Sequence, residues 1–274
     1  MKLQFTNKYY PRFDQFSRIL KLLESQQDGK KVSTYEIMMR LGIPQSQVKS
    51  FISFMVGCEL LTSRKMILTR LGKTVMQFDP FFERTETLWI IHYLVSSNPE
   101  FIIWYRIIHT VIPSRDQYLL HELRDFFFSD LQNHFSEYTF SMKIPAEIRS
   151  VFYAYTKSAL SQLRLISAEE DDRFIKNTPV NVPSFAFLYC LLRFAGKAFP
   201  GSTALNIEDG CYSENSPGRV FFLSEEQVRT LLEEIHHSGF IRLERQANLD
   251  QVRFLDSITP EFVLQKIYGG QDGN

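Results

Sequence analysis

The sequence predicts a mainly α-helical fold with an N-terminal winged helix, a central helical bundle and a C-terminal winged-helix-like module with short β-hairpins. Residues 32–70 follow the order of a winged helix, in which two helices joined by a tight turn precede a two-stranded ribbon. Residues 83–168 carry long apolar segments with helix start signals, and residues 219–268 repeat the order of the first module. We therefore expect three domains, covering residues 1–80, 81–168 and 169–274.

The stretch from Val32 to Arg70 predicts a short strand, a helix, a tight turn, a second helix and a two-stranded ribbon. Ser33 or Thr34 can cap the first helix, because a hydroxyl oxygen accepts a hydrogen bond from the free amides of the first turn. Gly42 is expected to end that helix, and Pro44 to open the next, where its missing N–H costs nothing. The second helix should bury the apolar residues that recur at helical spacing, namely Val48, Phe51, Ile52 and Met55.

The opposite face of this second helix is polar and forms the candidate DNA-binding surface. On a helical wheel that face gathers Ser46, Lys49, Ser50 and Ser53, with Gln45 and Gln47 at the helix start. The ribbon from Leu60 to Arg70 is the expected wing, and its phosphate-binding residues would be Arg64, Lys65 and Arg70. Small polar side chains beside a basic ribbon can lie in a DNA groove. Winged helices also serve as protein-docking modules, and a polar face can simply be solvated, so both interpretations stay open.

The other elements of the first two domains are predicted from the spacing of apolar residues and from residues that start or end helices. A first helix is expected over Phe13–Leu23, and a closing helix over Leu71–Phe78. The block from Glu83 to Ala168 is expected to be helical throughout, with one helix from Arg115 to Asn133 and a short extended piece between Phe135 and Ile144. The acidic run of residues 169–172 is the expected boundary with the third domain.

The third domain is expected to begin with a helix over Phe185–Phe199 and a loop over residues 200–217. Arg219–Phe222 then reads as a strand, and Ser224 with Gln227 as the capping box of the main helix. Residues 240–245 and 251–255 are expected to pair as a hairpin before a final helix over residues 260–268. The main helix is acidic and would repel phosphate, so this module indicates a docking surface for a protein or a solvated face.

Charge is distributed unevenly, although the formal net charge of the 274 residues is zero. Residues 1–80 hold 13 Lys and Arg against 6 Asp and Glu, whereas the remaining residues hold 18 against 25. A zero net charge excludes a uniformly basic coat for nucleic acid. A basic first domain on an acidic body is nevertheless the kind of asymmetry that suggests a polyanionic partner.

No motif indicates an enzyme, a metal site or a cofactor. Gly72-Lys73-Thr74 resembles the end of a P-loop, but the required earlier glycine is replaced by Ile67. No serine lies in a Gly-x-Ser-x-Gly elbow, and the histidines lack zinc-ligand spacing. The three cysteines form no close pair, and no segment suits a signal peptide or a membrane span. These absences favour a cytoplasmic, non-enzymatic protein without a cofactor.

Several segments together resemble the domain of unknown function 4007 family. They are Phe5–Phe16, Thr87–Tyr105, Ser184–Ala195, Ser216–Ile235 and Gln246–Leu255. The most specific is the Leu-Trp-x-x-His-x-x-x-x-Ser-Asn-Pro pattern from Leu88 to Pro99. The resemblance implies a bacterial protein encoded beside sulfur-transfer enzymes of DNA phosphorothioate modification and anti-phage defence. No enzymatic activity is established for that family, so the resemblance supplies no catalytic residue.

Two functional hypotheses follow. The first is a DNA-binding accessory or regulatory protein of a bacterial DNA-modification or anti-phage defence system, with duplex DNA held by the polar helix and the basic wing. The second is a protein-interaction scaffold or adaptor in the same kind of complex, without direct DNA contact. The expected partners are therefore duplex DNA and protein components of such a complex, with a homodimer left open and no membrane involved.

Overall fold

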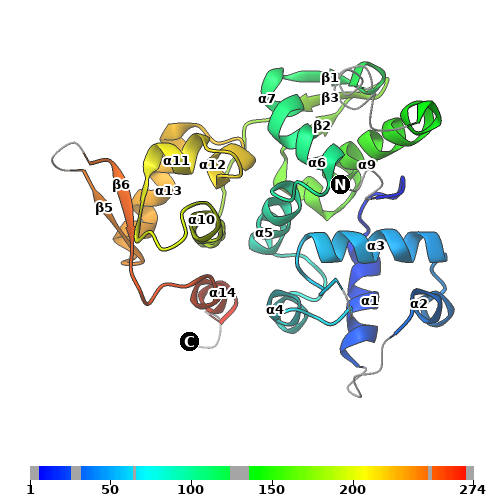
Figure 1. Cartoon of the computed structure of the whole chain (residues 1–274), viewed down its shortest axis with the longest axis horizontal. Helices are drawn as coiled ribbons and strands as arrows, with labels where there is room; N and C mark the ends of the chain where they lie inside the picture. The colour runs from blue at the N-terminus through cyan, green and yellow to red at the C-terminus, as the bar shows by residue number, and fades with distance from the viewer. Residues whose placement is uncertain (1–5, 26–31, 64–65, 124–135, 246–248, 270–274) are drawn as a thin grey trace. The chain divides into compact units, whose positions relative to one another are not determined.

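The computed structural model describes residues 6–25, 32–63, 66–123, 136–245 and 249–269 (Figure 1). The chain forms two compact units. Unit 1 comprises Met1–Arg84 and Leu94–Asn177, and unit 2 comprises Thr85–Tyr93 and Thr178–Asn274. The acidic residues 169–172, expected to mark a domain boundary, instead connect two paired strands of one sheet in unit 1.

The described residues up to position 79 form four helices of unit 1, as the sequence predicts: α1 (Phe13–Glu24), α2 (Thr34–Leu41), α3 (Gln45–Gly57) and α4 (Arg70–Phe78). Ser33 caps α2, since its side chain accepts a hydrogen bond from the Glu36 amide, and Gly42 ends α2 with a φ of 68°. An aromatic cluster holds α1 against α3 and includes Phe13, Phe16, Phe51 and Phe54. The capping residue Ser33 and the turn residue Gly42 therefore predicted the position of α2 and of the turn before α3 correctly.

The strands of the predicted winged helix are not confirmed. In the described part of this segment, a single β-bridge between Leu61 and Leu68 stands where a two-stranded ribbon was expected. The Thr62 amide also donates to the Ile67 carbonyl at 2.8 Å. Val32 and Ser33, directly before α2, form no strand. Arg64 and Lys65, the expected tip of the wing, lie outside the described residues.

The remainder of unit 1 is not helical throughout, which corrects the prediction for residues 83–168. Helix α6 (Ile102–Arg106) continues through the π-helical turn η1 (Ile107–Val111) into α7 (Ile112–Ser114). A strand, β1 (Gln117–Leu119), follows where a helix from Arg115 was expected. It pairs antiparallel with β3 (Arg173–Lys176), which also pairs with β2 (Ile166–Ala168). The three residues of β1 carry too little pattern to reveal a pairing so distant in sequence.

A second correction concerns residues 135–144, where a short extended piece was expected. The described part holds the π-helical turn η3 (Thr139–Lys143), which runs directly into α9 (Ile144–Lys157). Pro145 lies in the first turn of α9, and the 3₁₀ turn η4 (Ala159–Leu163) follows α9. Phe152 of α9 packs on Phe174 of β3, with ring centroids 4.8 Å apart, so the sheet covers this helix.

Unit 2 contains the first nine residues of α5 (Thr85–Ser96), followed by α10 (Ser184–Ala198), α11 (Ile207–Tyr212), α12 (Pro217–Val220), α13 (Glu225–His237) and α14 (Pro260–Gly269). Its sheet has the order β4-β6-β5, formed by Ala204–Asn206, Gln251–Phe254 and Ile241–Glu244. The predicted hairpin and the capping box of α13 are confirmed. The predicted strand Arg219–Phe222 is wrong, because Ser216 caps a helical turn there and the third strand comes from the predicted loop.

The motif residues Trp89 and His92 form the core of unit 2. Both are buried, and the His92 Nε2 lies 3.0 Å from the Val220 carbonyl oxygen. Trp89 packs on Phe221 with ring centroids 4.6 Å apart, and His92 stacks on the same ring. These residues therefore serve packing in unit 2 and do not line an open pocket.

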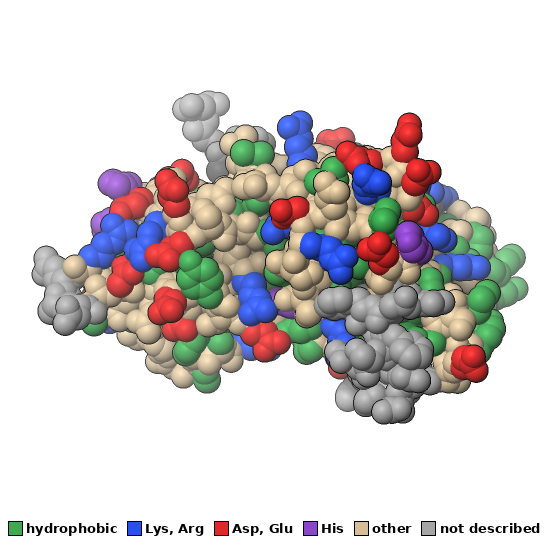
Figure 2. Space-filling view, turned by 90° about the horizontal axis from the view of Figure 1, so that it is seen from above, with side chains coloured by type: hydrophobic (Ala, Val, Ile, Leu, Met, Phe, Trp, Pro, Cys, Tyr) green, Lys and Arg blue, Asp and Glu red, His purple; other side chains and the backbone are tan. Residues whose placement is uncertain are grey.

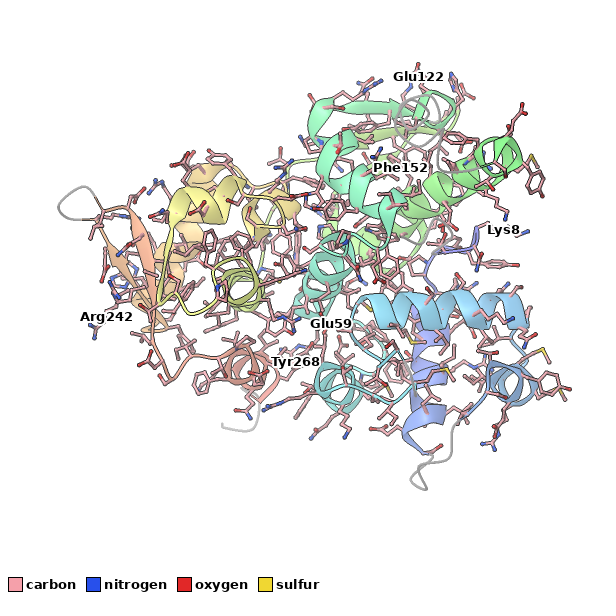
Figure 3. All side chains as sticks on the ribbon, viewed as in Figure 1. Lys8, Glu59, Glu122, Phe152, Arg242 and Tyr268 are labelled. Atoms are coloured by element: carbon pink, nitrogen blue, oxygen red, sulfur yellow. The ribbon has the colours of Figure 1, made fainter. Side chains whose placement is uncertain are left out.

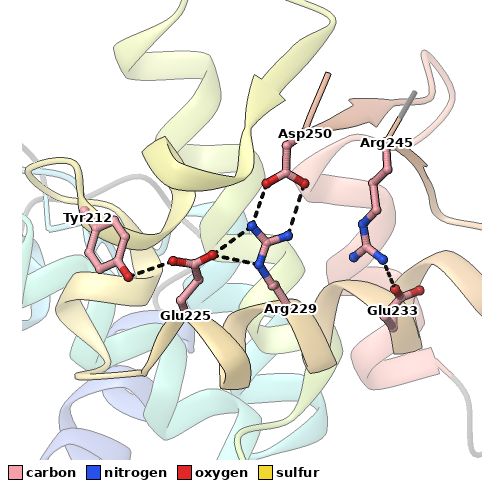
Figure 4. A network of polar contacts seen from close by, with 6 residues as sticks. All are labelled: Tyr212, Glu225, Arg229, Glu233, Arg245 and Asp250. Atoms are coloured by element: carbon pink, nitrogen blue, oxygen red, sulfur yellow. Dashed lines mark hydrogen bonds and ion pairs between the residues drawn. The ribbon is translucent and has the colours of Figure 1, made fainter. Parts of the chain in front are cut away.

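Two of the four acidic side chains of α13, Glu225 and Glu233, form ion pairs within unit 2 (Figure 4). Arg229 contacts Glu225 at 2.8 Å and Asp250 at 2.5 Å. These hydrogen bonds from Arg229 lower the pKa of both carboxyl groups. Arg245 contacts Glu233 at 2.5 Å, so arginines of the same unit offset the charge of these two glutamates.

We expect Gly72→Ala to destabilise the protein. Gly72 is buried in α4, and a Cβ there would overlap the backbone carbonyl of Leu60, which cannot move as a side-chain end could. The expected loss is about 1–3 kcal/mol in the free energy of unfolding, measured by urea titration. Gly196→Ala in α10 is the matched control, because a Cβ there meets no atom within 4 Å. The control should be neutral or slightly stabilising, and equal losses in both variants would contradict this account.

Candidate functional site

A groove of about 730 Å³ lies in unit 1 between the first turn of α3 and the η3–α9 segment. Residues 7–9 of the N-terminal segment form part of it, and Figure 3 shows Lys8 between α3 and α9. Its lining includes three of the predicted DNA-binding residues, Gln45, Ser46 and Lys49. The opposite side is supplied by Tyr138, Met142, Lys143, Ala146 and Glu147.

Thr6 fixes the N-terminal segment between the two sides of this groove. Its amide and its hydroxyl both donate to Glu147 Oε2 on α9, at 2.9 and 2.7 Å. The Ser50 hydroxyl on α3 donates to the Thr6 carbonyl. The same carbonyl accepts the Tyr9 amide at 2.9 Å, which closes a turn over residues 6–9. Thr6 thus links α3 to α9 through one short segment, which we call the Thr6 clamp.

The turn that follows the clamp has an uncommon backbone conformation. Asn7 and Lys8 adopt φ values of 46° and 68°, in the left-handed region that few non-glycine residues enter. Such conformations persist only where the surroundings hold them, and they gather at functional sites. Here they direct the chain so that Lys8 and Tyr9 line the groove, and the Tyr9 hydroxyl lies 3.2 Å from the Ser46 hydroxyl.

The charged residues that line the groove are Lys8, Lys49, Lys143 and Glu147. Burial raises the pKa of Glu147, although hydrogen bonds from the Thr6 amide and hydroxyl lower it in part. The groove also borders the N-terminus of α3, where Pro44 offers no side-chain cap and the helix dipole is positive. An anion is therefore favoured there. Elsewhere, on the face shown in Figure 2, Lys and Arg side chains lie among Asp and Glu side chains.

The η3 side of the groove exposes large side chains. Tyr138 is 66% exposed and Met142 is 62% exposed, which is unusual for side chains of their size. The Lys143 Nζ lies 5.9 Å from the centroid of the Tyr138 ring, a cation–π arrangement. This side therefore presents a cation beside an accessible aromatic face.

The predicted DNA-binding residues divide into four groups in the structure. Gln45, Ser46 and Lys49 line the groove, while Gln47 and Ser53 are half-buried and Arg70 is exposed, all three outside its lining. Ser50 was expected on the outward face, and this is wrong: it is buried because residues 6–9 cover that part of α3. Arg64 and Lys65 lie outside the described residues.

Sequence reasoning missed Lys8, Tyr9, Tyr138 and Lys143. The Lys8-Tyr9-Tyr10 run does combine a cation with aromatic side chains, a composition typical of strand-binding proteins. No local pattern marks Tyr138 and Lys143, which only the tertiary fold brings to α3.

Within the described ranges, no three His, Cys, Asp or Glu side chains gather as a metal site. His109 is buried, with its Nε2 3.1 Å from the Ser96 carbonyl oxygen, as expected for a core histidine. Among the described helices, none has the length and apolar character to cross a bilayer.

The chain belongs to the family described as "Protein of unknown function (DUF4007)", which it matches over residues 7–268. A solved structure described as magnesium ion-bound SspB is similar, with a TM-score of 0.80, 16% identity and coverage of 98% of this chain and 88% of that chain. A second SspB crystal structure has a TM-score of 0.77 with the same identity and coverage. At this identity the likeness shows a shared fold. No curated protein matches the chain.

We expect the stability contribution of Glu147 to fall as pH rises. Its pKa is raised in the folded protein, so the folded state holds the proton more tightly than the unfolded chain. The contribution is therefore fully present below the ordinary pKa of 4.5 and is lost as pH rises through the folded value. Urea titrations at several pH values should show wild type losing stability relative to Glu147→Gln over this range.

Asp14→Asn provides a control of opposite sign in the same unit. Burial alone would raise the pKa of Asp14, but the hydrogen bond from Arg12 helps to bring it below its usual value. Wild type should accordingly lose stability relative to Asp14→Asn as pH falls through that lowered pKa. A constant difference between wild type and Glu147→Gln at all pH values would contradict the raised pKa.

Proposed function

We propose that this protein is a DNA-binding accessory protein of a bacterial DNA-modification or anti-phage defence system. It holds the phosphate backbone of DNA in the groove at the start of α3. The observation that carries the proposal is the convergence of Lys8, Lys49 and Lys143, from three separate segments, on that groove.

The electrostatics support a polyanion as the ligand. Within the described residues, no acidic side chain forms an ion pair with Lys8 or Lys49, so their charges are not offset by the fold. Glu147, the carboxyl group of the lining, is buried and has a raised pKa. Gathering cations in one concave site is unfavourable in the free protein and favourable once phosphates displace the local ions.

The biological setting is supported by the family and by the fold. Members of this family are expected to be encoded beside genes of DNA phosphorothioation and anti-phage defence. In such systems the polyanionic ligand would be DNA. The likeness to SspB over 98% of the chain agrees with membership in such a system. One of these SspB structures is described as magnesium ion-bound, and magnesium ions commonly accompany phosphate groups.

We expect substitution of a groove lysine to weaken DNA binding and its salt dependence together. Each phosphate contact contributes about 0.7–0.9 units to the slope of log affinity against log salt concentration. Lys8→Ala, Lys49→Ala and Lys143→Ala in the full chain should each reduce the slope by up to about one unit, as measured by fluorescence anisotropy with a labelled oligonucleotide.

Two variants sharpen this test. Lys21→Ala, at an exposed lysine of α1 outside the groove, should leave the slope unchanged. Arg70→Ala tests the wing expected from the sequence. A reduced slope of log affinity against log salt concentration in this variant would show that Arg70 contacts a phosphate. Affinity that does not depend on salt, or that none of the groove variants alters, would overturn the proposal.

We also propose that the chain contributes no catalytic centre of its own. Supercoiled plasmid incubated with the protein and magnesium chloride should remain intact on an agarose gel, with a magnesium-free incubation as the control. Nicking or linearisation that requires magnesium would contradict this part of the proposal, and loss of that nicking in Lys49→Ala would locate it in the groove.

A protein-docking role is the second candidate, and one observation favours it. Tyr35 and Met39 lie one turn apart on α2 and are 58% and 64% exposed, so they form a small apolar surface. Retention of a partner protein after nuclease treatment, and its loss in Met39→Glu, would support this candidate over direct DNA contact.

A further inference from the structure

Resting on the proposed function, we infer that the groove binds single-stranded DNA, with at least one unstacked base on the ring of Tyr138, and that it does not read duplex DNA.

The position of α3 argues against major-groove readout. A recognition helix must project from the protein, because its first-turn side chains have to reach the base edges inside a groove roughly 12 Å wide. Here Gln45, Ser46 and Lys49 line a concave site whose opposite side is formed by η3 and α9. Ser50, one turn further along α3, is buried under the N-terminal segment. The groove volume of about 730 Å³ falls within the range of small-ligand sites and suits individual nucleotides.

The tyrosines that line the groove, Tyr9 and Tyr138, can contact the bases of an unpaired strand. Bases in a duplex have both faces stacked, whereas an unpaired base can place one face on an aromatic ring. Tyr9 is held beside the groove by its hydrogen bond with Ser46, and Tyr138 exposes 66% of its surface at the opposite side. Tyr138 therefore has a ring face accessible to a base.

A lysine lies beside each of these rings. Lys8 lies next to Tyr9, with its Nζ 5.8 Å from the ring centroid, and Lys143 makes the corresponding arrangement with Tyr138. Lys49 lines the α3 side. A single strand also carries a phosphate beside each base, so lysines can contact the phosphates while the rings contact the bases. Basic grooves with stacking platforms are the general solution for binding single strands.

Three labelled ligands test this inference with the 274-residue chain by fluorescence anisotropy at fixed salt. They are a 12-nucleotide thymidine homopolymer, an abasic strand of equal length and a 12-base-pair duplex. The abasic strand keeps the phosphates and lacks the bases. Because stacking strengthens binding per base, we expect the thymidine strand to bind about tenfold more tightly than the abasic strand. We also expect it to bind more tightly than the duplex.

Variants then assign this preference to the groove. Tyr138→Ala should reduce the thymidine-to-abasic ratio by severalfold, whereas Tyr138→Phe, which keeps the ring, should preserve it. Tyr35→Ala, at a tyrosine of α2 that is 58% exposed and outside the groove, should leave the ratio unchanged. Lys49→Ala should weaken binding of the thymidine and abasic strands alike, because both carry phosphates.

The outcomes separate this inference from the function on which it rests. Equal affinity for thymidine and abasic strands, or tighter binding of the duplex, would overturn single-strand recognition while leaving DNA binding intact. Absence of salt-dependent binding to all three ligands would overturn both. Loss of the ratio in Tyr138→Phe would show that the hydroxyl, and not the ring, carries the preference, which would also overturn the stacking account.

Discussion

The candidate site depends on one interaction, the Thr6 clamp. Glu147 holds the amide and hydroxyl of Thr6 from α9, and Ser50 holds its carbonyl from α3. The clamp anchors the turn that carries Lys8 and Tyr9 into the groove, and it also satisfies Ser50, a polar residue that would otherwise be buried without a partner. One segment thus links two helices that are distant in sequence and determines which side of α3 remains accessible.

The clamp has a cost that is consistent with a functional role. Glu147 is almost fully buried, and burial raises its pKa, so the ionised carboxylate is disfavoured where it lies. Asn7 and Lys8 occupy the left-handed backbone region, which adds strain. An apolar contact could join α3 and α9 without either penalty. The present arrangement instead positions a lysine and a tyrosine opposite Lys143 and Tyr138, and this placement is what a purely structural contact would not require.

The sequence predicted the parts of the fold that local chemistry specifies. Ser33 begins α2, Gly42 ends it, and the Ser224–Gln227 capping box begins α13. These signals can be recognised in the sequence because a cap or a glycine turn depends only on residues a few positions away. The sequence did not predict strands that form only by pairing with a distant segment. Strand β1 is an example, because its partner β3 follows more than fifty residues later. The candidate site divides in the same way. The wheel of α3 correctly placed Lys49 on an accessible face, but it could not show that residues 6–9 cover Ser50.

The same limit applies to charge counting. The excess of 13 basic over 6 acidic residues in the first 80 positions places the predicted polyanion-binding surface within that segment. Yet Lys143, Tyr138 and Glu147 all lie outside that segment and complete the groove from η3 and α9. A fragment ending near Pro80 would retain Lys49 and lose both the second side of the groove and the carboxyl group of Glu147 that anchors Thr6. The candidate site is therefore a property of folded unit 1, and the segment from α2 to α3 contributes one side of it.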